Sequence, residues 1–151
     1  MPLKKVRDKL DQYDNIIQNM LTLRLSVIPT VADIKKENNM EIVHQDRESK
    51  MYSKMDKFAS EHGISSELLK KLYKEIISEA VSIEYDFMKN GFNTPSINED
   101  DMLELNSCMD RISDIFSMEF SENLNKLDKL AKKYNTTLYD LASIYHNNKL
   151  K

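Results

Sequence analysis

The sequence predicts an all-α protein, and two observations carry that prediction. The chain has 151 residues, of which only two are glycine and three are proline, whereas sandwiches and barrels of β-strands need turn residues about every 8–12 positions. Apolar residues instead recur at intervals of three and four along most of the chain, which is the period of an amphipathic helix. The scarcity of glycine also excludes the clustered-glycine loops of Rossmann and P-loop nucleotide sites.

A long helix is expected from Leu3 to about Glu37, where apolar residues follow the helical period. A helix of about 35 residues measures roughly 50 Å. That is longer than a domain of this size needs, so we expect part of the helix to pack against another chain. Pro29 interrupts the pattern, and because proline lacks a backbone N–H, we expect a bend over residues 25–29 without a full stop.

Two more helices are expected before residue 92. Residues 36–42 contain Asn38 and Asn39 and indicate a loop, and a helix should follow from about Asp46 to Glu61. Gly63 is the expected C-terminal cap of that helix, since glycine adopts the left-handed conformation most easily. Ser65 is the expected N-cap of a third helix ending near Asn90 and Gly91.

The segment Asn93-Thr94-Pro95-Ser96 has the composition of a linker. We therefore expect two parts, residues 1–92 and a helical C-terminal extension, residues 93–151. The extension should contain a helix from Glu99 to about Phe116, a second piece continuing to Tyr134, and a short final helix through Tyr145 that begins after residues 135–137.

Composition excludes several classes of function. The formal net charge of −3 argues against binding nucleic acid through a general basic surface. Cys108 is the sole cysteine, so neither an internal disulfide nor a cysteine zinc site is expected, and the three histidines lack metal-ligand spacing. No segment resembles a signal peptide or a membrane span. We therefore expect a cytoplasmic protein with no metal or cofactor.

Basic residues on the first two predicted helices form the informative set. At 100° per residue, Arg24 and Lys35 fall within about 20° of each other and about 16 Å apart. Arg7 points about 100° away from Arg24, which places it better for a site in a partner chain. Arg47 and Glu48 open the next predicted helix. Cationic side chains converging from several helices would bind a small dianion.

In this respect the sequence resembles the all-helical chorismate mutases over residues 3–90. Their first helix opens on an Arg, continues through I/L-D-x-x-D/N-x-x-I-x-x-L/M-L to a second Arg, and is followed by V-A-x-x-K, a loop and an R-E pair. The chain reads Val6-Arg7-Asp8-Lys9-Leu10-Asp11-Gln12-Tyr13-Asp14, Ile17, Met20-Leu21 and Arg24, then Val31-Ala32-Asp33-Ile34-Lys35, Ile42 and Arg47-Glu48. The match on the third helix is Leu72-Tyr73-Lys74-Glu75-Ile76-Ile77-Ser78-Glu79-Ala80, followed by Glu84.

The resemblance implies a three-helix protomer whose long N-terminal helix intertwines with a second copy, giving a homodimer that rearranges chorismate to prephenate. Arg24 and Arg47 would hold the substrate carboxylates, and Arg7 would be donated by the partner chain. Lys35 would donate to the ether oxygen, where negative charge develops. Glu48 would bind the substrate hydroxyl, and Glu84 would be the second group at the ether oxygen. Lys35, Glu84 and Arg24 are thus the implied catalytic residues.

The sequence departs from the family pattern at His44, where Asp is common, and at Ala80, where Ser is common. Three other readings remain open at this stage. An isochorismate-pyruvate lyase would use the same scaffold and cationic pocket. A helical dimerisation or regulatory module could keep the scaffold without activity, and an unrelated helical bundle could carry such arginines by chance.

Overall fold

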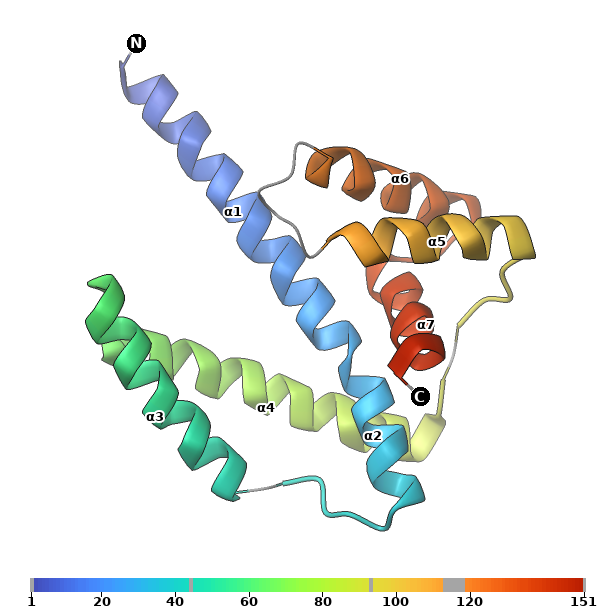
Figure 1. The fold of residues 1–151 in the computed structure, drawn as a ribbon, viewed down its shortest axis with the longest axis horizontal. Coiled ribbons are helices and arrows are strands. Elements are labelled where there is room, and N and C mark those ends of the chain that lie inside the picture. The colour runs from blue at the N-terminus through green and yellow to red at the C-terminus, as the bar shows by residue number, and fades with distance from the viewer. Residues whose placement is uncertain (1, 44, 93, 113–118, 151) are drawn as a thin grey trace. The chain divides into compact units, whose positions relative to one another are not determined.

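A computed structural model describes residues 2–43, 45–92, 94–112 and 119–150 of the chain. Within these ranges the secondary structure is entirely helical, which confirms the predicted all-α class (Figure 1). The helices are α1 (Pro2–Ser26), α2 (Ile28–Glu37), α3 (Gln45–His62), α4 (Ser66–Asn90), α5 (Glu99–Ile112), α6 (Phe120–Lys133) and α7 (Leu138–Leu150). None of these described helices is long and apolar enough to cross a membrane.

The chain divides into two compact units that do not follow one another in sequence. Unit 1 combines Met1–Thr30 with Asn93–Lys151, and unit 2 is Val31–Phe92. Unit 1 therefore contains α1 together with α5, α6 and α7, whereas unit 2 contains α3, α4 and most of α2.

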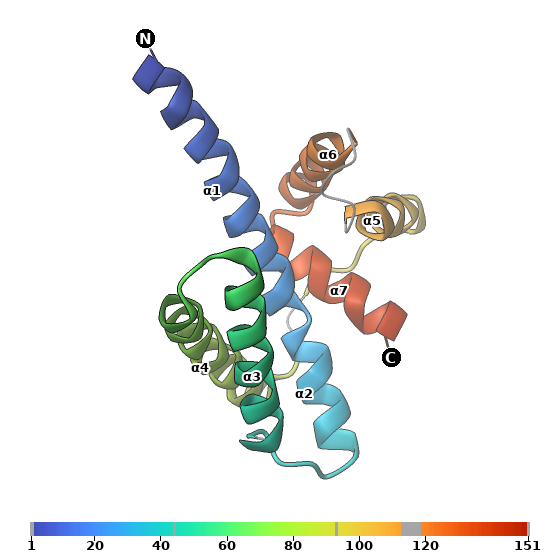
Figure 2. The same cartoon turned by 60° about the vertical axis from the view of Figure 1, so that its left-hand side comes forward.

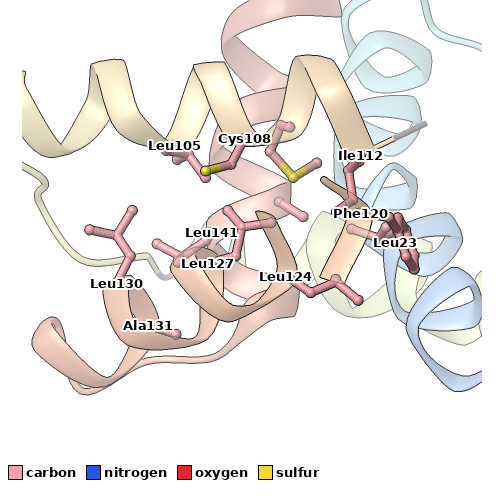
Figure 3. Packing of buried hydrophobic residues seen from close by; sticks show 12 residues of the cluster. Leu23, Leu105, Cys108, Ile112, Phe120, Leu124, Leu127, Leu130, Ala131 and Leu141 are labelled. Carbon is pink, nitrogen blue, oxygen red and sulfur yellow. The ribbon is translucent and has the colours of Figure 1, made fainter. Parts of the chain in front are cut away.

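Unit 1 is built around an apolar core that α5, α6 and α7 share with the second half of α1 (Figure 3). The side chains of Leu105, Leu127 and Leu141, one from each of the three C-terminal helices, are fully buried. Leu23 brings α1 into this core, and Ile16 and Met20 pack against it. The N-terminal half of α1 extends beyond α5–α7 (Figure 1), and its large apolar side chains are exposed.

The predicted interruption of the N-terminal helix lies at Val27. The α1 helix ends at Ser26 and α2 begins at Ile28. Pro29 has no N–H to donate to the carbonyl of Leu25, and its ring crowds that carbonyl, so the regular hydrogen bonding fails over this turn. The Val27 N–H bonds instead to the Arg24 carbonyl at 3.3 Å. The region predicted as one bent helix is thus two helices separated by a single residue.

Unit 2 contains a helical hairpin formed by α3 and α4, which pack against each other (Figure 2). Its turn follows the predicted capping chemistry. Gly63 has a φ of 73°, and the Ser65 side chain accepts a hydrogen bond from the Leu68 N–H at 3.1 Å. Gly91, with a φ of 68°, caps the other end of α4.

The extension follows the prediction less closely. The final helix runs to Leu150, five residues beyond the predicted end at Tyr145, because residues 146–150 contain neither glycine nor proline to stop it. The part of the prediction that extended α5 to Phe116 lies outside the described residues, as does Asn93 of the predicted linker.

A polar cluster ties the start of α5 to the end of α6. The Asp101 carboxylate accepts hydrogen bonds from Lys133 Nζ at 2.7 Å and from Tyr134 Oη at 2.5 Å. The Asn98 side chain caps α5 by accepting from the Asp101 N–H at 2.8 Å. The bond from Lys133, followed by the one from Tyr134, holds the pKa of Asp101 below its usual value.

This lowered pKa predicts a pH dependence of stability. The bonded carboxylate stabilises the fold fully above its unfolded pKa of about 3.9, and the contribution is lost as the pH falls through the lower folded value. The Asp101→Asn variant should therefore unfold more easily than wild type at pH 7, and the difference should shrink below about pH 4. Urea unfolding from pH 7 to pH 3 measures it, with exposed Asp100→Asn as the matched control. A difference that stays constant down to pH 3 would contradict the prediction.

Candidate functional site

The sequence-predicted site residues Lys35 and Glu84 form a partly buried ion pair in unit 2. Lys35 comes from α2 and Glu84 from α4, 49 positions later, yet Lys35 Nζ and Glu84 Oε1 are 2.7 Å apart. Their side chains are 16% and 5% exposed, respectively. A second acceptor, the backbone carbonyl of Ile42, receives a hydrogen bond from the same ammonium at 2.7 Å.

The pattern of α4 explains why its carboxylate is buried. Ala80, Glu84 and Phe87 recur at intervals of four and three, and together they are the buried residues of this helix. Glu84 thus occupies a position where an apolar residue would be expected from the helical period. Burying an unpaired carboxylate would be costly, and the ammonium of Lys35 offsets that cost.

Two further predicted residues, Arg47 and Glu48, lie in the first turn of α3 in the same unit. Arg47 is exposed and Glu48 is half-buried. Neither forms a hydrogen bond or ion pair with another part of the chain that the structure describes. His44, which precedes α3, lies outside the described residues.

Arg7 and Arg24 lie on α1, in unit 1. Arg7 is exposed, whereas Arg24 is half-buried near the end of the helix. The structure therefore brings Lys35 and Glu84 into contact and places Arg47 and Glu48 in the same unit. It locates the other two arginines on the long N-terminal helix.

Sequence reasoning missed the backbone carbonyl of Ile42 as part of this site. Every residue has a backbone carbonyl group, so the residue type does not indicate which carbonyl will accept a hydrogen bond. The nearest signal was Asn39, because asparagine is the residue that most often replaces glycine in the left-handed conformation. Asn39 has a φ of 52° and turns the chain back toward Lys35.

The chemistry of this arrangement follows from its donors. An ammonium has three N–H groups, and the contacts with Glu84 and Ile42 occupy two of them. No other acceptor among the described residues bonds to this ammonium, so its third N–H is available to an acceptor on a bound molecule. Ala80, one turn before Glu84, is buried at 7% exposure and brings no polar group to this face.

Comparison with known proteins gives a family match that includes these residues. The sequence profile of the family described as "Chorismate mutase type II" matches residues 6–85. No solved structure matches the chain significantly.

Three curated relatives are similar over 58–60% of the chain. The chorismate mutase of Methanocaldococcus jannaschii is 25% identical over 91 residues, covering 60% of this chain and 92% of the relative. The 4-amino-4-deoxychorismate mutase of Streptomyces pristinaespiralis is 24% identical over 90 residues, covering 60% of this chain and 70% of the relative. The bifunctional chorismate mutase/prephenate dehydratase of Buchnera aphidicola is 30% identical, covering 58% of this chain but only 23% of the relative.

Proposed function

The chain belongs to the type II chorismate mutase family, and from this membership we propose that it rearranges chorismate to prephenate. The reaction is unimolecular and needs no nucleophile, proton transfer or metal. A catalyst must hold the compact conformer of the dianion and stabilise the negative charge that develops on the ether oxygen. An acceleration of about 10⁶-fold requires only about 8 kcal/mol of differential stabilisation.

The observation that carries this proposal is the partly buried ammonium of Lys35. It lies within the family match, and its two protein contacts fix its position. A fixed cation in a poorly hydrated site stabilises developing negative charge more than a mobile one in water does. We assign to its third N–H the hydrogen bond to the ether oxygen.

The other roles follow from the resemblance. Glu84, which accepts from Lys35 through Oε1, would be the second group at the ether oxygen. Glu48 would bind the substrate hydroxyl. The two substrate carboxylates would be held by guanidinium groups, which match carboxylate geometry; these belong to Arg24, Arg47 and Arg7 of a second copy.

The surface of α1 supports this dimer. A stripe of large apolar side chains, each at least 50% exposed, runs along residues 3–17 of this helix and consists of Leu3, Val6, Leu10, Tyr13 and Ile17. Their spacing of three and four places them on one face of the helix. Contiguous exposed apolar surface of this kind is typical of an interface. Arg24 continues the stripe seven residues after Ile17, and Arg7 borders it.

Unit 2 exposes a second apolar surface on the α3–α4 hairpin, and its members are Phe58, Ile64, Leu68 and Leu72. Two exposed apolar surfaces on one chain can cover each other in a two-fold assembly, since each copy offers both. We therefore propose that a second copy covers the α1 stripe. Light scattering on the purified protein should give a mass of about twice 17.7 kDa.

Following chorismate absorbance with the purified full chain tests the proposed activity. Loss of chorismate with formation of prephenate is the expected result. Isochorismate, with salicylate and pyruvate as products, is the arm that tests the lyase alternative. Because one relative is named for 4-amino-4-deoxychorismate, that compound is the third substrate. If none of the three is consumed, the alternative of an inactive dimerisation or regulatory module is favoured.

The extension, residues 93–151, lies beyond the family match and carries none of the proposed site residues. Its division from residues 1–92 as a separate functional part stays a prediction.

A further inference from the structure

The loop that follows α2 is bonded twice to Lys35. The Lys35 carbonyl accepts a hydrogen bond from the Met40 N–H at 2.8 Å, and the Lys35 ammonium donates to the Ile42 carbonyl at 2.7 Å. One residue therefore holds the loop through both its backbone and its side chain. The loop in turn holds the ammonium at a fixed place beside Glu84.

Asn39 makes this return of the chain possible. Its φ of 52° is the left-handed conformation, which asparagine tolerates and which β-branched residues strongly disfavour. The bond from the Met40 N–H to the Lys35 carbonyl spans this residue. The turn at Asn39 thus begins the return of the chain that ends with the Ile42 carbonyl at Lys35 Nζ, while the exposed Asn39 side chain has no hydrogen bond to Lys35 or Glu84.

Fixing the ammonium before substrate arrives has a catalytic consequence. A free lysine side chain samples many rotamers, and a ligand that must order it loses binding free energy. With two of its N–H groups engaged, the direction of the third is set. Misplacement of a catalytic group by about 1 Å can cost about a hundredfold in rate.

We propose that Asn39 is a positioning residue, which orients Lys35 through the carbonyl of Ile42. This inference rests on the proposed function, because it assigns Asn39 a part in stabilising the ether oxygen. It predicts that backbone conformation at residue 39, rather than the asparagine side chain, controls the rate.

Kinetics of Asn39→Gly and Asn39→Val in the full chain test this. Glycine keeps the left-handed turn, so kcat should stay within about twofold of wild type. Valine disfavours the turn, so kcat should fall about 10–100-fold with a much smaller change in KM. Asn39→Ala, with a smaller barrier to the turn, should give an intermediate value. Equal activity of the glycine and valine variants would overturn the proposal.

A second measurement separates positioning from a general structural effect. In a Lys35→Met background, Asn39→Val should cause no further loss of residual activity, since there is no ammonium left to orient. A further loss of 10-fold or more there would show that residue 39 acts on something else.

The last measurement does not depend on turnover. The ¹⁵N signal of the Lys35 ammonium, assigned by its absence in Lys35→Met, should be visible in wild type and Asn39→Gly and broadened by solvent exchange in Asn39→Val. If wild type converts no substrate, the proposed function fails, and this signal alone decides whether Asn39 holds Lys35. An ammonium signal unaffected by valine would contradict the inference whatever the activity.

Discussion

Lys35→Met should lower kcat for the rearrangement of chorismate by about a thousandfold, the upper range found when one donor to a developing oxyanion is removed. Methionine keeps the unbranched side chain as far as the ε carbon but removes the ammonium with its three N–H groups. The ether oxygen then loses the donor that faces the developing charge, whereas the carboxylate contacts assigned to the arginines are unchanged. We therefore expect KM to change far less than kcat, as measured by chorismate consumption under steady-state conditions.

The same substitution should also destabilise the fold, and this effect must be separated from catalysis. Without the Lys35 ammonium, the Glu84 carboxylate loses its ion-pair partner although its side chain is only 5% exposed. Removing one partner of a buried pair typically costs about 3–5 kcal/mol. A double variant, Lys35→Met with Glu84→Leu, removes both charges and should recover much of the lost stability, because apolar replacements of buried pairs are commonly neutral.

The double variant separates the loss of activity from the loss of stability. It removes both groups assigned to the ether oxygen, so its loss of kcat is assigned to the pair. It should resemble wild type in urea unfolding and still show the loss in kcat. A double variant that is both stable and active would refute the assignment of Lys35. Recovered activity in proportion to recovered stability would mean that the single variant had lost only its fold.

The helices were predictable to within a few residues where capping residues mark their ends. Ser65, Gly63 and Gly91 each act in the structure as the sequence indicated. The end of α7 was predicted too early because no residue there signals a stop. The break at Val27 was predicted as a bend from Pro29, since the missing N–H is a local property of the chain.

The candidate site was less accessible to sequence reasoning because its contacts are distant along the chain. The contact between Lys35 and Glu84 spans 49 positions, and neither residue alone would be distinguished from a solvated charge on a helix. The ordered motif of the family supplied both positions, but spacing along the sequence could not supply their separation. The backbone carbonyl of Ile42 was outside the reach of any residue pattern.

The helix α1 shows why periodicity alone cannot assign partners. Its predicted apolar positions include Leu3, Leu10 and Ile17, and each of these side chains is at least 50% exposed. Leu23, by contrast, is buried in the core of unit 1. By helical geometry Leu23 points about 120° away from Ile17. The helix therefore has one apolar face for its own chain and another that is exposed. An exposed stripe beside two arginines is the reason to expect that the site is shared between two copies.

Pairing an Arg7→Ala chain with a Lys35→Met chain in one dimer should restore activity that neither variant has alone. If Arg7 serves the partner's site, the Arg7→Ala chain keeps its own Lys35 and receives an intact Arg7 from the other copy. One of the two sites is then complete. The mixed dimer, isolated through two different affinity tags, should have about half the kcat of a wild-type dimer.

The control is a dimer in which one chain carries both substitutions and the other chain is wild type. In a dimer of a wild-type chain with an Arg7→Ala/Lys35→Met chain, the wild-type Lys35 faces a partner without Arg7, and the other site lacks Lys35. Both sites are then incomplete, so this dimer should be nearly inactive. If Arg7 instead acts within its own chain, the opposite results are expected. The dimer with one wild-type chain should then have about half the kcat of a wild-type dimer, and the dimer of the two single variants should be nearly inactive. The pair of measurements thus decides which copy supplies Arg7, because both dimers contain the same side chains and differ only in how these are distributed.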